Sequence, residues 1–303
     1  MNKAILECKN ISKSFGNFQV LKHVNFQVAE GDIYGFLGPN GAGKSTCIRI
    51  ISDLLKADEG TVEIHGYRVD KNKEKALAST GMLIEKPAFY NHLSAERNLK
   101  ILVDLLPDCS YKDIGRVLKF VDLEETAGRK VKHYSQGMKQ RLGIAQALMG
   151  NPRLIILDEP INGLDPLSMK ELRELFVRLR NEGLTILMSS HLLYEVERSC
   201  NRMCIINKGE IIQEGGVKAL MYHSSVSKIE FVSDNHSGLK SILDAHFDSS
   251  QIETGEKGWV VKMKQSDILD MSEILRKNGI QLTYIIPRTN LEDYFIESVE
   301  SKK

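Results

Sequence analysis

The sequence lacks an apolar run of about 18 residues, the length that a membrane-spanning helix needs. Its first ten residues, MNKAILECKN, also lack the apolar core of a signal peptide. Neither sign of charge is in excess, because 41 basic residues face 40 acidic ones. These absences predict a soluble, cytoplasmic chain with no nucleic-acid partner, since proteins that bind polyanions usually carry a basic surplus.

Cysteine is scarce as well, with five residues scattered over 303 positions. An odd and scattered set indicates reduced thiols in a reducing compartment. Cys200 and Cys204 could share one helix face, but neither a histidine nor a further cysteine stands close by to complete a metal site. We therefore interpret the cysteines as structural residues.

The most specific motif in the sequence is GPNGAGKST, which fits the phosphate-binding pattern G-x-x-x-x-G-K-[ST]. In this pattern glycines turn backbone N–H groups around phosphate oxygens, the lysine binds the outer phosphates and the serine hydroxyl ligates Mg²⁺. Apolar spacing predicts a buried strand before the motif and a helix after it, a context that argues against a chance glycine turn. The predicted nucleotide-binding loop comprises Gly38, Pro39, Asn40, Gly41, Ala42, Gly43, Lys44, Ser45 and Thr46.

Residues 5–28 contain two alternating runs separated by Gly16 and Asn17, which predicts an antiparallel hairpin. Phe15 stands at the turn of this hairpin, upstream of the phosphate loop. An aromatic side chain at that place could stack on a purine, but a partly buried turn residue explains the position almost as well.

The middle of the chain reads as a helical insertion between strands. A short strand over residues 81–84 ends at Glu85, and Ser94 is a suitable N-cap for a helix over residues 95–106. Helical spacing continues over residues 108–128.

A second dense stretch is YSQGMKQRLGIAQALMGNPRLIILDEP. Ser135, Gln136 and Gly137 are predicted to precede a helix whose N-terminus would offer free N–H groups to an anion. The strand LIILD then ends in Asp158, followed by Glu159. Beside a phosphate loop, Asp158 stands where an acid that holds Mg²⁺ is expected, and Glu159 stands where a general base is expected. Acidic pairs at strand ends are often only solvated, but that interpretation leaves the phosphate loop unexplained.

His191 lies at the end of the predicted strand TILMSSH, at the same predicted sheet edge as Asp158. Between the two, Asp165 and Pro166 are predicted to begin a helix that runs to Asn181. A lone histidine is usually a surface or core residue. Its place at a third strand end favours contact with a ligand.

Small polar residues around 221–228 break the pattern and predict a linker between two domains, residues 1–221 and residues 229–303. The second domain reads as a small α+β unit without a catalytic constellation. Its predicted strands are residues 228–234, 259–264 and 282–287, and its predicted helices are residues 238–247, 266–278 and 291–299.

Taken together, these motifs resemble those of the ATP-binding subunits of ABC transporters. GPNGAGKST matches the Walker A motif of that family, LIILDEP matches Walker B, and YSQGMKQ stands where the family has its LSGGQ signature. NGLDP matches the D-loop and SSH the switch histidine, all in the family's order from residue 5 to about residue 216. The resemblance implies an α/β P-loop ATPase domain with a mixed-sheet core, an antiparallel β subdomain and a helical subdomain, followed by the small α+β domain.

The resemblance also implies ATP and Mg²⁺ as cofactors and a role for each matching residue. Phe15 matches the aromatic that stacks on adenine, and the loop from Gly38 to Thr46 holds the phosphates. Ser135 and Gly137 match signature residues that contact the ATP of the other subunit, which implies a dimer, expected to be a homodimer, with two ATP molecules. The implied catalytic residues are Lys44, Glu159 and His191, and the implied Mg²⁺ site comprises Ser45, Asp158 and Glu85.

The sequence departs from the family pattern at four positions. Tyr134, Gln136 and Met138 replace a leucine, a glycine and a glutamine of the signature, and Glu85 stands where most members have a glutamine. LIEKPAFYNHLSAERNL, which contains that glutamate, is similar to the pattern in ATPase subunits of bacitracin and lantibiotic self-protection exporters. The C-terminal unit resembles the extensions of such subunits only in its size and in its LEDYF ending.

The resemblance implies ATP hydrolysis that drives a separate integral membrane permease, which exports a peptide antibiotic. The subunit would then lie on the cytoplasmic face of the plasma membrane, and residues 85–99 would dock a cytoplasmic helix of the permease. One alternative is a soluble ABC-type ATPase that acts on a ribosome or nucleic-acid complex. Such proteins usually carry two cassettes or a long coiled-coil insertion, and this chain has neither. Another alternative is a regulatory ATPase without a transport role.

Overall fold

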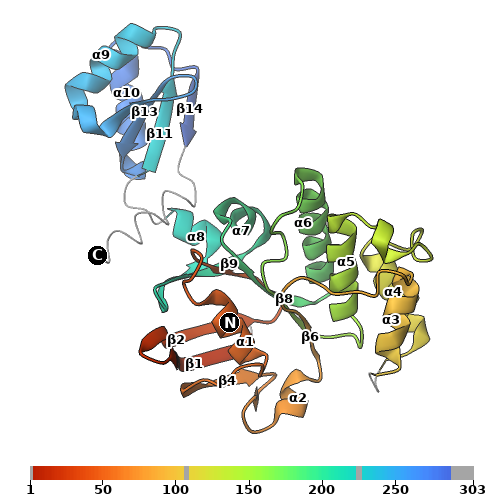
Figure 1. Ribbon diagram of the computed structural model, residues 1–303. Coiled ribbons are helices and arrows are strands. Elements are labelled where there is room, and N and C mark those ends of the chain that lie inside the picture. The colour runs from red at the N-terminus through yellow and green to blue at the C-terminus, as the bar shows by residue number, and fades with distance from the viewer. Residues whose placement is uncertain (1–2, 106–108, 223–226, 288–303) are drawn as a thin grey trace. The chain divides into compact units, whose positions relative to one another are not determined.

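The chain forms two compact units, Met1–Val217 and Lys218–Lys303, in the computed structural model shown in Figure 1. The structure describes residues 3–105, 109–222 and 227–287. The predicted helix over residues 291–299 and the LEDYF segment lie outside the described residues. Within them, no helix combines the length and the apolar character that crossing a bilayer requires.

An antiparallel sheet in the order β2-β1-β4-β5 forms one layer of the first unit. Its strands are β1 (Ala4–Phe15), β2 (Phe18–Ala29), β4 (Glu59–Ile64) and β5 (Tyr67–Arg68). The predicted hairpin is confirmed, with Phe15 paired to Phe18 across the turn. Leu6, Ile11 and Val24 are completely buried. Leu6 and Ile11 are an odd number of residues apart, and an irregularity in the pairing between Cys8 and Ile11 interrupts the simple alternation of the strand.

A six-stranded mixed sheet in the order β10-β9-β3-β8-β7-β6 forms the second layer. Its parallel strands are β3 (Ile33–Leu37), β6 (Thr80–Leu83), β7 (Leu154–Leu157), β8 (Thr185–Ser190) and β9 (Arg202–Asn207). The edge strand β10 (Glu210–Gly216) runs antiparallel to β9. Every residue of β3, β7 and β8 is buried, as expected for parallel strands that are covered on both faces.

Helix α1 (Lys44–Ile51) packs between the two sheets, where one core cluster contains residues from all three elements (Figure 1). The remaining helices of this unit are α2 (Lys73–Leu77), α3 (Ala95–Val103), α4 (Tyr111–Phe120), α5 (Gln136–Ala147), α6 (Pro166–Asn181) and α7 (Leu193–Ser199). Helices α3, α4 and α5 pack on one another and form the predicted helical insertion.

Two local expectations are wrong. The signature helix α5 begins at Gln136, so Gln136 and Gly137 form its first turn instead of preceding it, because the Ser135 hydroxyl caps the helix by accepting a hydrogen bond from Met138 N–H. Cys200 and Cys204 share no helix face, since Cys200 ends α7 and Cys204 lies in β9. Both are buried, and burial raises the pKa of both thiols, so they stay protonated.

The second unit has a β-α-β-β-α-β order and an antiparallel sheet with the strand order β12-β13-β11-β14, which is a ferredoxin-like arrangement. Helix α8 (Val217–Tyr222) starts at the boundary between the two units and precedes the first strand of this sheet. Its elements are β11 (Ser227–Val232), α9 (His236–His246), β12 (Ile252–Thr254), β13 (Trp259–Met263), α10 (Ile268–Lys277) and β14 (Tyr284–Pro287). Phe231 and Val261 of the sheet form one core with Leu243 of α9 and Leu275 of α10. The sequence did not predict the short strand β12.

Replacing Gly81 with alanine is expected to destabilise the first unit. A methyl group at this position of β6 would lie 1.8 Å from the carbonyl oxygen of Ala147 at the end of α5. Overpacking of this kind costs about 1–3 kcal/mol. Thermal unfolding measures the effect, with Gly128→Ala as the control, since a methyl group at Gly128 has no atom within 4 Å. Equal melting temperatures of the two variants would contradict this packing.

Candidate functional site

The carboxyl ends of three parallel strands bring the predicted site residues together. The phosphate loop follows β3, the acidic pair Asp158 and Glu159 follows β7, and His191 follows β8. In the register, Leu37 pairs with Ser190 and Leu157 with Met188, so the three strands end side by side. Ligands of open α/β sheets generally bind beyond the carboxyl ends of the strands.

The phosphate loop runs from the end of β3 to the first turn of α1. Gly43, the N-cap of α1, has a φ of 109°, which is open to glycine but not to residues with a side chain. A Cβ atom there would also lie 2.6 Å from the side chain of Leu21. The loop therefore depends on glycine at this position, and it leaves the first N–H groups of α1 available to an anion.

Lys44 is the buried cation of the site, with only 6% of its surface exposed. Its ammonium group donates hydrogen bonds to the carbonyl oxygens of Gly38 at 2.8 Å and Pro39 at 3.2 Å. It also lies 3.2 Å from Oε1 of Glu159. These partners compensate a charge that would be costly to bury alone.

Glu159 joins Lys44 to His191. Its Oε2 lies 2.8 Å from Nδ1 of His191, while its Oε1 faces Lys44. The backbone of Glu159 is left-handed, with a φ of 48°. One carboxylate thus contacts both the phosphate-loop lysine and the histidine after β8.

Asp158 is buried, and its Oδ1 accepts a hydrogen bond from the Ser189 hydroxyl at 2.5 Å. Within the described part of the chain, no group of three or more His, Cys, Asp or Glu side chains forms a metal site. Mg²⁺ at phosphate sites needs fewer protein ligands, because it takes one or two from the protein and the rest from phosphates and water. The oxygen donors of Asp158 and Ser45 fit that ion.

A hollow of about 400 Å³ opens in front of these groups. Its lining includes predicted residues of the phosphate loop together with Glu159 and His191. It also includes residues that the sequence analysis missed, namely Phe18, Val20 and Asn162. The pairing of Phe18 with Phe15 across the hairpin turn was the available signal for the first of these.

Several predicted residues lie elsewhere. Phe15 is half-exposed and is absent from the lining, which contains Phe18, its partner across the hairpin turn. Glu85 has a left-handed backbone and forms an ion pair with Arg49 of α1. Ser135 and Gly137, at the start of α5, do not line the hollow of their own chain.

Asp165 connects the D-loop, which contains Asn162, to α6. Its carboxylate accepts hydrogen bonds from the N–H groups of Leu167 at 3.1 Å and Ser168 at 3.0 Å and from the Ser168 hydroxyl at 2.7 Å. These bonds, with that of the Ser168 hydroxyl first, hold the pKa of the Asp165 carboxyl below its usual value. The D-loop therefore ends in a well-capped helix.

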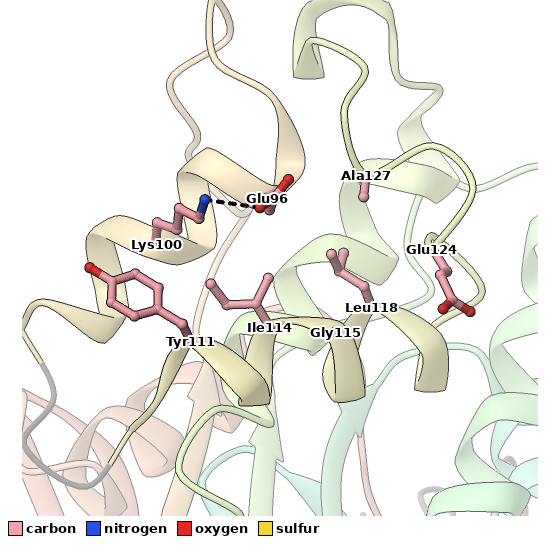
Figure 2. A pocket seen from close by; sticks show the side chains of 8 residues that line it. All are labelled: Glu96, Lys100, Tyr111, Ile114, Gly115, Leu118, Glu124 and Ala127. Atoms are coloured by element: carbon pink, nitrogen blue, oxygen red, sulfur yellow. Dashed lines mark ion pairs between the residues drawn. The ribbon is translucent and has the colours of Figure 1, made fainter.

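A second hollow, of about 590 Å³, lies between α3 and α4. Figure 2 shows Ile114 and Leu118 of α4 pointing into it, with the ion pair of Glu96 and Lys100 on one side and Glu124 on the other. The hollow therefore has an apolar floor and a charged rim.

Comparisons with known proteins agree with the family that the motifs resemble. The sequence model of the family described as ABC transporter matches residues 21–162. The bacitracin transport ATP-binding protein BcrA of Bacillus licheniformis is 36% identical over 298 residues, which cover 97% of each chain. The lantibiotic transport ATP-binding protein SrtF of Streptococcus pyogenes is 41% identical over 210 residues, 69% of this chain and 90% of that protein.

Among solved structures, the ADP conformation of MJ1267, an ATP-binding cassette of an ABC transporter, superposes with a TM-score of 0.66. Its sequence is 29% identical, and the superposition covers 74% of this chain and 96% of the MJ1267 chain. The fold, the order of the motifs and the near full-length relative lead to one conclusion. The chain belongs to the ATP-binding subunits of ABC transporters, which bind and hydrolyse ATP.

Proposed function

We propose that two copies of this chain bind two ATP molecules between them and that their hydrolysis drives a separate membrane permease that exports a peptide antibiotic. The observation that carries the proposal is the contact of Glu159 with both Lys44 and His191 beside the phosphate loop. Subunits of this family dimerise and work with membrane permeases. The names of BcrA and SrtF support bacitracin or a lantibiotic as the exported class.

The pairing of the two copies follows from the position of the signature. Ser135, which is exposed, and Gly137, which is buried, stand at the start of α5 and do not line the hollow that contains their own phosphate loop. A second copy would present the same helix end to this hollow and complete it. The helix end favours the negative charge of ATP phosphates.

Hydrolysis would use the charges of Lys44 and Glu159, which neutralise one another before ATP binds. The phosphates of ATP attract Lys44 away from Glu159, and the freed carboxylate can accept a proton from the attacking water. His191 keeps its contact with Glu159 and orients it. Mg²⁺, held by Asp158 and Ser45 and by Glu85 where its loop approaches, would neutralise phosphate charge.

We place the permease contact on the loop of residues 85–99 and on the adjoining hollow between α3 and α4. Glu96 belongs to both. The apolar floor suits an amphipathic helix, and the acidic groups Glu96 and Glu124 suit basic residues of such a helix. Docking there would hold the subunit at the cytoplasmic face of the plasma membrane. The transport names of the relatives favour this function over a ribosome-associated or nucleic-acid-associated ATPase.

Replacing Glu159 with glutamine should slow ATP hydrolysis by roughly 10²-fold or more, the usual effect of losing a general base, while ATP binding survives. Steady-state hydrolysis and nucleotide titration measure the two properties. Glu174→Gln, an exposed position on α6, is the matched control. Hydrolysis at the parental rate by the Glu159 variant would remove this residue from the proposed role.

Growth inhibition by a panel of peptide antibiotics, including bacitracin and lantibiotics, tests the exported class. Cells with the intact gene should tolerate higher concentrations than cells without it, and cells with Glu159→Gln should not. If no antibiotic distinguishes the three strains, the peptide antibiotic proposal is wrong, while the ATPase assignment is unaffected.

Replacing Gly115 with tryptophan should block the hollow without harming the helix. Gly115 is exposed on α4, lines the hollow and has no atom within 4 Å of an added Cβ. Co-purification with the permease should fall about tenfold or more, the change that 1.4 kcal/mol of binding free energy represents. ATP hydrolysis by the isolated subunit should be unchanged. Lys112→Trp, exposed on α4 but outside the hollow, is the control, and an equal loss in both variants would refute this docking site.

A further inference from the structure

The side chain of Ser189, in β8, joins the two acidic residues that follow β7. It is completely buried, donates a hydrogen bond to Oδ1 of Asp158 at 2.5 Å and accepts one from Glu159 N–H at 2.8 Å. A hydroxyl has one proton to donate and lone pairs to accept with. Ser189 is therefore a hydrogen-bond donor to Asp158 and a hydrogen-bond acceptor from Glu159, two adjacent residues of the site.

The hydrogen bond to Glu159 N–H lies where the strand pairing has ended. The last pair of the β7–β8 ladder is Leu157 with Met188, and Asp158 N–H donates to the carbonyl oxygen of Leu83 in β6. At Glu159 the partner on the β8 side is a side chain instead of a backbone carbonyl. Ser189 thus sets the position of the first peptide group beyond the ladder.

The hydrogen bond from Glu159 N–H to Ser189 supports an uncommon backbone conformation of Glu159. Its φ of 48° lies in the left-handed region, which a residue with a side chain adopts only when its surroundings hold it there. In that conformation its carboxylate reaches Lys44 and His191. An extended conformation would point the side chain in another direction.

We infer that Ser189 is a positioning residue for ATP hydrolysis. It holds Glu159 in the turn that directs its carboxylate to the phosphate loop, and it engages one oxygen of Asp158 so that the other is left for Mg²⁺. The inference rests on the roles proposed above for Asp158 and Glu159. Hydrogen-bond partners of metal-ligating carboxylates orient them, and their loss typically costs about 10–100-fold in metal affinity or activity.

Three variants test the inference. Ser189→Ala removes the hydroxyl, and Ser189→Thr keeps it. Thr185→Ala is the matched control, since Thr185 is also completely buried in β8 but its hydroxyl accepts a hydrogen bond from Gly31 N–H at 3.0 Å, away from the acidic pair. For each variant the measurements are the melting temperature, kcat and KM for ATP hydrolysis, and the binding of Mn²⁺ as a substitute for Mg²⁺ in the presence of a non-hydrolysable ATP analogue.

We expect Ser189→Ala to lower kcat and to weaken Mn²⁺ binding by about 10–100-fold, with little change in KM for ATP. Ser189→Thr should restore both properties. Thr185→Ala should lower the melting temperature without changing either. Parental kcat and Mn²⁺ binding in Ser189→Ala would overturn the inference, and so would equal losses in Ser189→Ala and Ser189→Thr.

Two further comparisons keep the result decisive. If Ser189→Ala fails to fold, Ser189→Thr decides, because a folded threonine variant that loses Mn²⁺ binding contradicts the inference and one that keeps it supports a role for the hydroxyl. Glu159→Gln is measured alongside. If that variant hydrolyses ATP normally, the proposed function fails, whereas a slow Glu159→Gln beside a normal Ser189→Ala overturns only the role of Ser189.

Discussion

The buried ammonium group of Lys44 is the constraint on which the site depends. A buried cation is tolerated only where polar partners surround it. Two partners are carbonyl oxygens of the phosphate loop and the third is the carboxylate of Glu159, which comes from a different strand. The loop must therefore curl around the lysine, and β3 and β7 must end at the same edge of the sheet. ATP enters a site whose charges already neutralise one another, so its phosphates replace a partner of Lys44 instead of meeting an uncompensated charge.

The parallel pairing of the strands also places the end of β8 beside this site. Since β8 lies between β3 and β7, its last residues can reach both the acidic pair and the phosphate loop. Ser189 bonds the carboxylate of Asp158 and the backbone N–H of Glu159, and two residues later His191 contacts the carboxylate of Glu159. The end of β8 thus provides two side chains that hold Glu159, one through its backbone and one through its carboxylate.

Short linear motifs made much of this site predictable. The phosphate loop, Asp158, Glu159 and His191 each stand at a strand end, where local sequence shows both the residue and its place. Contacts between distant segments were not visible in the same way. Phe18 lies in none of the motifs, and the motifs that contain Asn162 and Ser189 do not show which residues these two contact, because they acquire their neighbours only through folding. The strand β12 escaped prediction because three residues are too few to show an alternation. The start of α5 was predicted two residues too late, because the cap at Ser135 was not identified from the sequence.

The ion pair of Glu85 and Arg49 bears on how the permease contact could reach the ATP site. The side chains are 65% and 47% exposed, and such surface pairs contribute only about 0–1 kcal/mol. For the Mg²⁺ role that we propose, Glu85 would have to leave Arg49, and a pair this weak would oppose that movement very little. Its loop continues to Ser94, the N-cap of α3, and α3 forms one wall of the hollow that we propose as the permease contact. Under the proposed function, permease docking and the approach of Glu85 to Mg²⁺ would be coupled through this one short segment.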